Sequence, residues 1–270
     1  MKQFEVLCVT MHQKDFTLLN KMHLNSDVLI CNQGDQWGSS ENVYRGYRAR
    51  MITTDTRGVG INRNLCLLNA DAEICLMADD DLVYRENYRE KILEEFKNHP
   101  EADVIIFNIG TSTPEFGRIP TVTSKFTRFH FWSKNPYGAP RVAFRLDKLK
   151  QKNLYFSTCF GGGCIFKTGE DTIWIEQMRK SGLRIYLSPE FIGDVSYEVS
   201  TSLIEDVPEK LYTKGAMLEA TRGIMTLPKM LLYAFLRKNG TLKGTQAFHM
   251  MNEGRKGFRI LQSYDAYEER

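Results

Sequence analysis

The run Asp79-Asp80-Asp81 is the part of the sequence whose residue types point most directly to chemistry. It follows the apolar segment Ile74–Ala78, which has the length of a buried strand. Three adjacent carboxylates repel one another, so they need either solvent or a cation. A solvated acidic turn would explain an isolated run. The position after a buried strand instead favours a divalent ion held by one or two carboxylates and diphosphate oxygens.

A glycine-containing loop, residues 55–61, leads into a helix expected over Asn62–Asn69. Arg63 lies near the start of this helix, where it could meet a phosphate beside free backbone N–H groups. The alternative is a plain helix start with a surface arginine. The dinucleotide-binding pattern G-x-G-x-x-G does not match, because Arg63 takes the place of the third glycine, so a dinucleotide-binding protein is disfavoured.

A third candidate is the pair Glu170-Asp171, which follows Gly169 and opens a helix expected to end at Ser181. Acidic residues in a first helical turn commonly complement the helix dipole. The functional interpretation is a carboxylate that acts as a general base on the hydroxyl of an acceptor.

Short apolar runs alternate with helical patterns and predict the elements that must position these side chains. The expected strands are 4–10, 28–31, 51–54, 73–78, 104–107, 142–146, 154–156 and 183–187, and the expected helices are 16–24, 62–69, 86–98 and 168–181. This order predicts an α/β fold with a mostly parallel central sheet and helices on both faces. Residues 110–140 lose periodicity, so we expect a functional loop there.

The segments CVTMHQKD, RGVGINRN, MADDD, FGGG and GEDTIWIEQMRKSG occur in an order that resembles the family 2 glycosyltransferases, especially small bacterial enzymes of capsule and exopolysaccharide assembly. The resemblance covers roughly residues 4–200. It implies the Rossmann-like GT-A fold in a catalytic domain at 1–205, with a nucleotide-sugar half at 1–109 and an acceptor half at 110–205.

The resemblance also implies roles for individual residues. Nucleotide-sugar contacts are expected from Thr10, Met11, Asn32, Arg63, Asp79 and Asp80. Asp80 or Asp81 would hold Mn²⁺ or Mg²⁺ on the diphosphate, and the choice between them stays open. Asp171 is the expected catalytic base, with Glu170 beside it, and the acceptor side would include Gly161, Gly162 and Gly163.

Two departures from the family pattern bear on the substrate. Where the family often has Asp-Asp-Gly-Ser after the second strand, this chain has Asn32-Gln33-Gly34-Asp35. The resemblance implies a UDP-sugar as the donor. An amide can still accept a hydrogen bond from a uracil N–H, but it can also donate, so this departure weakens the case for UDP and the base stays open. The Gln-x-x-Arg-Trp motif of processive members is absent, so one sugar per encounter is expected, with inversion at the anomeric carbon.

The tail differs in charge from the rest of the chain. Residues 210–270 hold 11 Lys/Arg and 5 Asp/Glu, a net charge of +6 within a total of +3. The apolar stretch Gly223–Leu236 is interrupted by Pro228 and Lys229 and is too short to span a membrane. Residues 206–270 are expected to form a helical extension that either contacts a membrane surface or packs on the catalytic domain. Such a tail favours an undecaprenyl-linked or other glycan acceptor and a location at the inner face of a bacterial cytoplasmic membrane.

Other classes of protein have less support. None of the six cysteines forms a C-x-x-C pair, and the five histidines lack zinc spacing. The start MKQFEVLCVT reads as a strand and not as a signal peptide. No motif suggests nucleic-acid binding. A nucleotidyltransferase and a non-catalytic nucleotide- or glycan-binding protein remain the alternatives.

Overall fold

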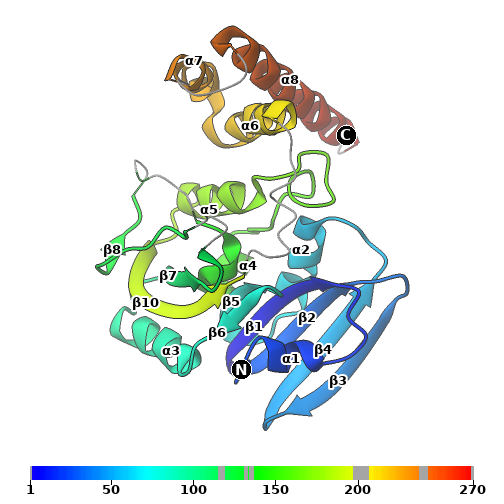
Figure 1. Ribbon diagram of the computed structural model, residues 1–270, viewed down its shortest axis with the longest axis vertical. Coiled ribbons are helices and arrows are strands. Elements are labelled where there is room, and N and C mark those ends of the chain that lie inside the picture. The colour runs from blue at the N-terminus through cyan, green and yellow to red at the C-terminus, as the bar shows by residue number, and fades with distance from the viewer. Residues whose placement is uncertain are drawn as a thin grey trace.

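The computed structural model describes residues 2–114, 119–130, 133, 137–196, 207–236 and 243–268. One mixed sheet runs through the molecule in the order β3-β4-β2-β1-β5-β9-β7-β10-β6, and β8 pairs with β10 (Figure 1). The strands are β1 (Lys2–Met11), β2 (Asp27–Gln33), β3 (Gly38–Tyr44), β4 (Tyr47–Thr54), β5 (Ala72–Asp79), β6 (Leu82–Tyr84), β7 (Val104–Thr111), β8 (Thr127–Arg128), β9 (Val142–Arg145) and β10 (Ile185–Val195). Strands β4, β2, β1 and β5 are parallel, as are β7 and β10.

Helices cover both faces of this sheet. They are α1 (Thr17–Lys21), α2 (Val59–Asn69), α3 (Tyr88–Asn98), the 3-10 turn η2 (Ala139–Arg141), α4 (Leu146–Gln151), α5 (Glu170–Lys180), α6 (Val207–Arg222), the 3-10 turn η4 (Gly223–Met225), α7 (Thr226–Leu236) and α8 (Gly244–Glu268). The predicted α/β class, the mostly parallel sheet and the helices on both faces are therefore confirmed.

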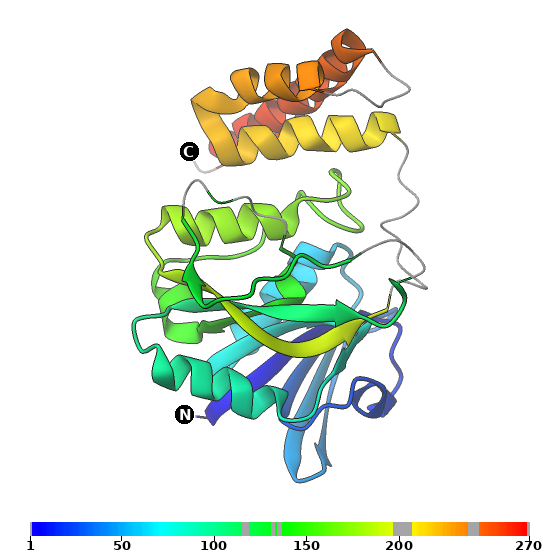
Figure 2. The same ribbon diagram turned by 60° about the vertical axis from the view of Figure 1, so that its left-hand side comes forward.

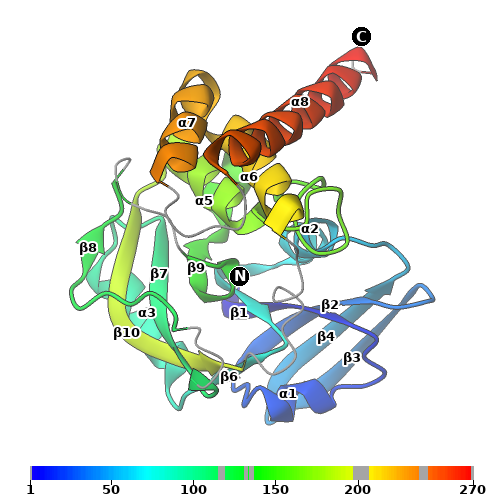
Figure 3. The same ribbon diagram turned by 45° about the horizontal axis from the view of Figure 1, so that its top comes forward.

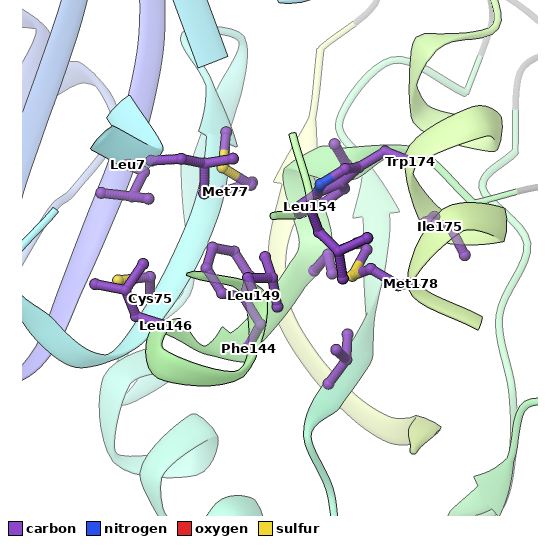
Figure 4. Close-up of a cluster of buried hydrophobic side chains, with 14 of the residues drawn as sticks. Leu7, Cys75, Met77, Phe144, Leu146, Leu149, Leu154, Trp174, Ile175 and Met178 are labelled. Atoms are coloured by element: carbon purple, nitrogen blue, oxygen red, sulfur yellow. The ribbon is translucent and has the colours of Figure 1, made fainter. Parts of the chain in front are cut away.

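The core has two layers because successive residues of a strand point to opposite faces. In β1, Leu7 and Val9 join the cluster beneath α2 and α5, whereas Val6 and Cys8 join the cluster beneath α1 and α3. Figure 4 shows part of the first cluster, in which Leu7, Cys75 and Met77 face side chains that include Phe144, Leu149 and Trp174. Because both faces of the sheet are buried at β1 and β5, the sequences of these two strands are almost continuously apolar.

Several predicted elements differ from the structure. The hairpin strand β3 was not predicted, nor were β6 and α4. β10 continues to Val195, well beyond the predicted end at Leu187. The predicted strand 154–156 is wrong: this segment joins no ladder, and Phe156 instead exchanges two hydrogen bonds with the side-chain amide of Asn64, at 2.7 and 2.9 Å.

The loop predicted over 110–140 has little regular structure where it is described. Only β8 and η2 interrupt it, and Phe129 and Tyr137 are buried in the core beneath α5. Residues 115–118, 131–132 and 134–136 of this prediction lie outside the described residues, as does the predicted domain boundary at 205/206.

The three C-terminal helices form a bundle above α5 (Figure 2). Glycines let α6 and α8 approach closely: a Cβ on Gly215 would lie 1.8 Å from the Met251 carbonyl oxygen, and one on Gly254 would lie 1.8 Å from that of Tyr212. Phe160, Phe166 and Ile173 of the catalytic domain share a buried cluster with Ala216 of α6 and Phe258 of α8. Of the two interpretations of the tail, α6 and α8 show the packing on the preceding part of the chain, and contact with a membrane surface stays a prediction.

Candidate active site

The strand register brings the predicted polar residues to one edge of the sheet. Thr10 of β1 lies opposite Asn32 of β2, and Val9 lies opposite Asp79 of β5. Parallel strands present their carboxyl ends at the same edge, where open α/β sheets bind ligands. The Asp79–Asp81 run therefore meets the ends of β1 and β2.

Arg63 joins this edge to the start of α5. Its Nη2 donates to both carboxylate oxygens of Asp79 at 3.0 and 3.2 Å, and its Nη1 donates to Asp171 Oδ1 at 2.5 Å and to Glu170 Oε1 at 3.4 Å. The Arg63 side chain is only 3% exposed. Burial alone would lower the pKa of Arg63, but the three carboxylates together raise it. The guanidinium is thus a cation shared by Asp79, a predicted nucleotide-sugar contact, and Asp171, the predicted base.

Arg63 and Asn64 are neighbours on α2, and both contact Phe156. Asn64 holds the backbone of Phe156, and the Phe156 ring lies 5.2 Å from the Arg63 guanidinium carbon. On its other side this ring stacks on Trp174 of α5 at 4.1 Å. The arginine was predicted to contact phosphate, yet its Nη donors face protein carboxylates. To contact a phosphate through these donors, Arg63 would have to release one of the three carboxylates.

Asp80 and Asp81 have a different environment. Asp80 Oδ2 accepts a hydrogen bond from Thr10 Oγ1 at 2.5 Å, which links the predicted nucleotide-binding end of β1 to the acidic run. Burial, and then the charges of Asp79 and Asp80, raise the pKa of Asp81 to about 7. The ion pairs of the described site residues all involve Arg63, and none includes Asp80 or Asp81.

The donor set fits a divalent ion only if the substrate supplies ligands. Within the described part of the chain, no group of three or more His, Cys, Asp or Glu side chains could hold a metal ion. Mg²⁺ commonly uses one or two carboxylates and completes its shell with phosphate oxygens and water. Two hard oxygen donors without a neutralising cation, Asp80 and Asp81, suit that arrangement. The choice between them stays open.

Asn32 holds the loop after β1. Its Oδ1 accepts from the backbone N–H of Gln13 at 2.9 Å, and its Nδ2 donates to the Gln13 carbonyl at 2.9 Å and to Thr53 Oγ1 at 3.1 Å. The residue is 1% exposed, so its amide is occupied on both sides. Base recognition by Asn32 stays a prediction, and the amide would have to break these bonds to contact a base directly. Met11, another predicted nucleotide contact, ends β1 and is 48% exposed.

The three-glycine loop packs against the start of α2. The Gly162 carbonyl accepts from Val59 N at 3.0 Å. Gly161 has a φ of 104°, and a Cβ there would lie 2.4 Å from Val59 Cγ1 and 2.9 Å from Glu170 Cδ. Gly162, by contrast, has open space where a Cβ would be. The predicted acceptor side therefore borders Glu170, and Gly161 supports the site through its close approach.

Glu170 and Asp171 differ in access. The side chain of Glu170 is 14% exposed and that of Asp171 is 24% exposed. Burial, and then the charge of Asp171, raise the pKa of Glu170. A Cβ on Gly138 would lie 3.4 Å from Asp171 Oδ2, the oxygen that Arg63 does not hold. Gly138 therefore lies beside that oxygen.

Reasoning from sequence missed several supporting residues. Gln33 holds the 55–58 loop by donating to the carbonyls of Thr56 and Gly58 at 3.0 and 3.3 Å. Asn62 is buried and donates to the Cys31 carbonyl at 2.8 Å. Their polar side chains inside otherwise apolar elements were the only local signal. Nothing local marks Gly138 or Phe156, because their roles come from contacts with distant residues.

The description "Glycosyl transferase family 2" belongs to the family model that matches residues 16–166, more than half of the chain. The chain belongs to this family. The matched segment includes Asn32, Arg63, Asp79–Asp81 and Gly161–Gly163 but stops before Glu170. No curated protein sequence matches the chain significantly.

Solved structures of TarS from S. aureus share the GT-A fold with this chain. The TarS 1–349 structure in complex with UDP superposes with a TM-score of 0.61 at 14% identity, covering 94% of this chain and 92% of that one. The TarS 1–349 complex with UDP-GlcNAc gives 0.57 at 17% identity, covering 93% and 71%. A longer TarS structure gives 0.57 at 13%, and there the match spans 54% of TarS. Identities this low show the fold alone.

Proposed function

We propose that this glycosyltransferase moves a single sugar, with inversion, from a UDP-sugar to a hydroxyl group of a glycan or lipid-linked acceptor in bacterial surface polysaccharide synthesis. The observation that carries the proposal is the Arg63 clasp, which joins Asp79 at the end of β5 to Glu170 and Asp171 at the start of α5. A donor site and a base are thereby tied to one buried cation. The UDP and UDP-GlcNAc in the TarS structures support UDP as the nucleotide.

In this proposal each part of the site has one task. Asp171, held by Arg63 through Oδ1, takes the proton of the acceptor hydroxyl through Oδ2 while the oxygen attacks the anomeric carbon. Asp80 or Asp81 would hold Mn²⁺ or Mg²⁺, which would stabilise the negative charge of the departing diphosphate. Thr10 fixes the orientation of Asp80, and the Gly161–Gly163 loop borders the acceptor.

We further propose that the acceptor, an undecaprenyl-linked or other surface glycan, is reached at the inner face of the cytoplasmic membrane. The basic charge of residues 210–270 supports peripheral membrane contact, and no described helix is long and apolar enough to cross a bilayer. Family membership disfavours the nucleotidyltransferase alternative. A non-catalytic nucleotide- or glycan-binding protein is the alternative that the experiment below must address.

A thermal-shift panel of nucleotides and nucleotide sugars, with and without Mn²⁺, tests the proposal on the wild type and Asp81→Ala. A ligand at a hundred times its Kd stabilises the folded state by about 2.7 kcal/mol. A Mn²⁺-dependent shift with UDP that disappears in the variant supports the metal-dependent donor site. Donor binding without any sugar transfer or donor hydrolysis would instead favour the non-catalytic protein, and no shift with any nucleotide would reject the donor site.

A further inference from the structure

The helix α7 lies at the outer end of the molecule, in the C-terminal bundle (Figure 3). This helix and the preceding turn η4 carry apolar side chains that are exposed to solvent. Ile224 is 95% exposed and Phe235 is 86% exposed. The exposed side chains of this surface, which we call the α7 face, are Ile224, Leu227, Leu231, Leu232, Phe235 and Leu236. Contiguous apolar surface of this kind marks an interaction site, whereas single exposed apolar residues need no explanation.

The opposite side of α7 is also apolar, and it is buried. Thr226, Met230 and Ala234, spaced four residues apart, face inward. Met230 and Ala234 pack in a cluster with Leu211 of α6 and Met251 of α8. A helix that is apolar on all sides is usually buried on all sides. In α7 the small or slender residues pack in the bundle, whereas the bulky apolar residues are exposed to solvent. We therefore expect the α7 face to bind a partner.

The composition of the chain around α7 indicates an anionic partner. Residues 222–243 of the sequence contain five basic residues and no Asp or Glu: Arg222, which pairs with Glu176, and Lys229, Arg237, Lys238 and Lys243. An apolar helix face flanked by Lys and Arg is typical of segments that lie in the headgroup region of anionic membranes. A second copy of the chain docking on the same face would bring equal positive charges together, which disfavours a two-fold dimer there.

The dimensions of α7 fit a position in the membrane surface. The helix has 11 residues, which at 1.5 Å per residue is roughly half of the hydrocarbon thickness of a bilayer. It is also tied rigidly to the catalytic domain. Arg222, at the end of α6, donates to the buried carboxylate of Glu176 on α5 at 3.3 Å. Asp171 lies in the first turn of the same α5, so a surface bound to α7 has a fixed relation to the proposed base.

We infer that the α7 face docks on an anionic lipid bilayer and holds the Gly161–Gly163 side of the site toward a membrane-borne acceptor. The inference deepens the proposed function, because it assigns the membrane contact to one helix face and not to the tail as a whole. α6 and α8 serve as the support: their residues pack on Phe160 and Phe166, whose loop contains the three glycines.

Co-sedimentation of the full chain with vesicles tests the inference, using phosphatidylglycerol–phosphatidylcholine mixtures against phosphatidylcholine alone. The double variant Leu231→Glu/Phe235→Glu should reduce binding to the anionic vesicles at least tenfold, since two bulky apolar side chains no longer enter the lipid. Lys229→Glu should reduce it about fivefold or more, and added salt should weaken wild-type binding. Val43→Glu, at a 71% exposed position on β3, is the matched control and should bind as the wild type does.

Leu231 and Phe235 are exposed, so thermal unfolding and the Mn²⁺-dependent UDP shift should be unchanged in the double variant and in Val43→Glu. Wild-type chain that stays in the supernatant, or equal binding by the double variant, would overturn the inference. The inference would also be overturned if light scattering showed a dimer of the wild type that is lost in the double variant, and if the wild type did not bind vesicles. Loss of the UDP shift in the wild type would instead count against the proposed function, whatever the vesicles show.

Discussion

Arg63 holds Asp171 through a single carboxylate oxygen: its Nη1 lies 2.5 Å from Oδ1, while a Cβ on Gly138 would face Oδ2. The same guanidinium grips both oxygens of Asp79. The proposed base is therefore oriented by a residue that also contacts Asp79 on the proposed donor side. Any shift of Asp79 on donor binding would reach Asp171 through one rigid planar group.

Arg63→Lys is expected to destabilise the protein by about 1–3 kcal/mol, because one ammonium group cannot bridge three partly buried carboxylates. Thermal unfolding measures this effect. Arg85→Lys is the control, since Arg85 makes a bidentate pair with Asp194 at 2.7 Å but is 44% exposed, and it should cost less than about 1 kcal/mol. Equal, small changes in both variants would show that Arg63 does not clasp the site.

Asp171→Asn is expected to lower sugar transfer by about 10²- to 10⁴-fold while sparing donor binding, as loss of a general base does. UDP release in the presence of extracted lipid-linked glycan measures transfer, and the Mn²⁺-dependent thermal shift measures binding. Glu170→Gln, beside it but less exposed, should have the smaller effect on transfer. The reverse order would assign the base to Glu170.

Asp81→Asn is expected to stabilise the metal-free protein by about 1–2 kcal/mol at pH 8. Burial and the neighbouring carboxylates raise the pKa of Asp81 to about 7, above its value of 3.8 in the unfolded chain. The folded state therefore binds this proton more tightly, and ionisation costs stability as pH rises from about 4 to 7. The gain of the variant should shrink as pH falls toward 5. A gain that does not depend on pH would contradict this origin.

Gly161→Ala and Gly162→Ala form a matched pair in the acceptor-side loop. Gly161→Ala should cost about 1–3 kcal/mol and slow transfer, because its positive φ strains alanine and the new Cβ would press on Val59 and Glu170. Gly162→Ala should leave stability within about 0.5 kcal/mol of the wild type. Thermal unfolding and acceptor KM check both. An effect of Gly162→Ala on KM alone would place the acceptor against that residue.

The sequence predicted the elements whose burial is strong and regular. β1 and β5 are apolar on both faces, so their runs are visible without any partner. β3 was missed because its residues are almost all exposed at the edge of the sheet and show no apolar alternation. The apolar segment 154–156 resembles a strand, yet Phe156 is buried against Trp174 and not in a ladder.

The residue types of the candidate site could be predicted from the sequence, but the contacts between these residues could not. The acidic run and the Glu170-Asp171 pair stand out locally because carboxylates follow apolar runs or begin a helix. The sequence near Arg63 does not show that this arginine pairs with those carboxylates, because Asp171 lies far along the chain. The same limit applies to Asn32, whose partners Gln13 and Thr53 come from two separate segments.

The cluster that joins Phe160 and Phe166 to Phe258 also sets the order in which the protein can mature during synthesis. The strands, α2 and α5 leave the ribosome before α6 and α8. Glu176 can pair with Arg179 of its own helix at once, but its contact with Arg222 and the packing of the glycine loop on α8 must wait for the C-terminal helices. The nascent chain would thus complete its nucleotide side early and its acceptor side late. A chain that stalls between these two stages would expose aromatic side chains that chaperones recognise, before the proposed base has its final support.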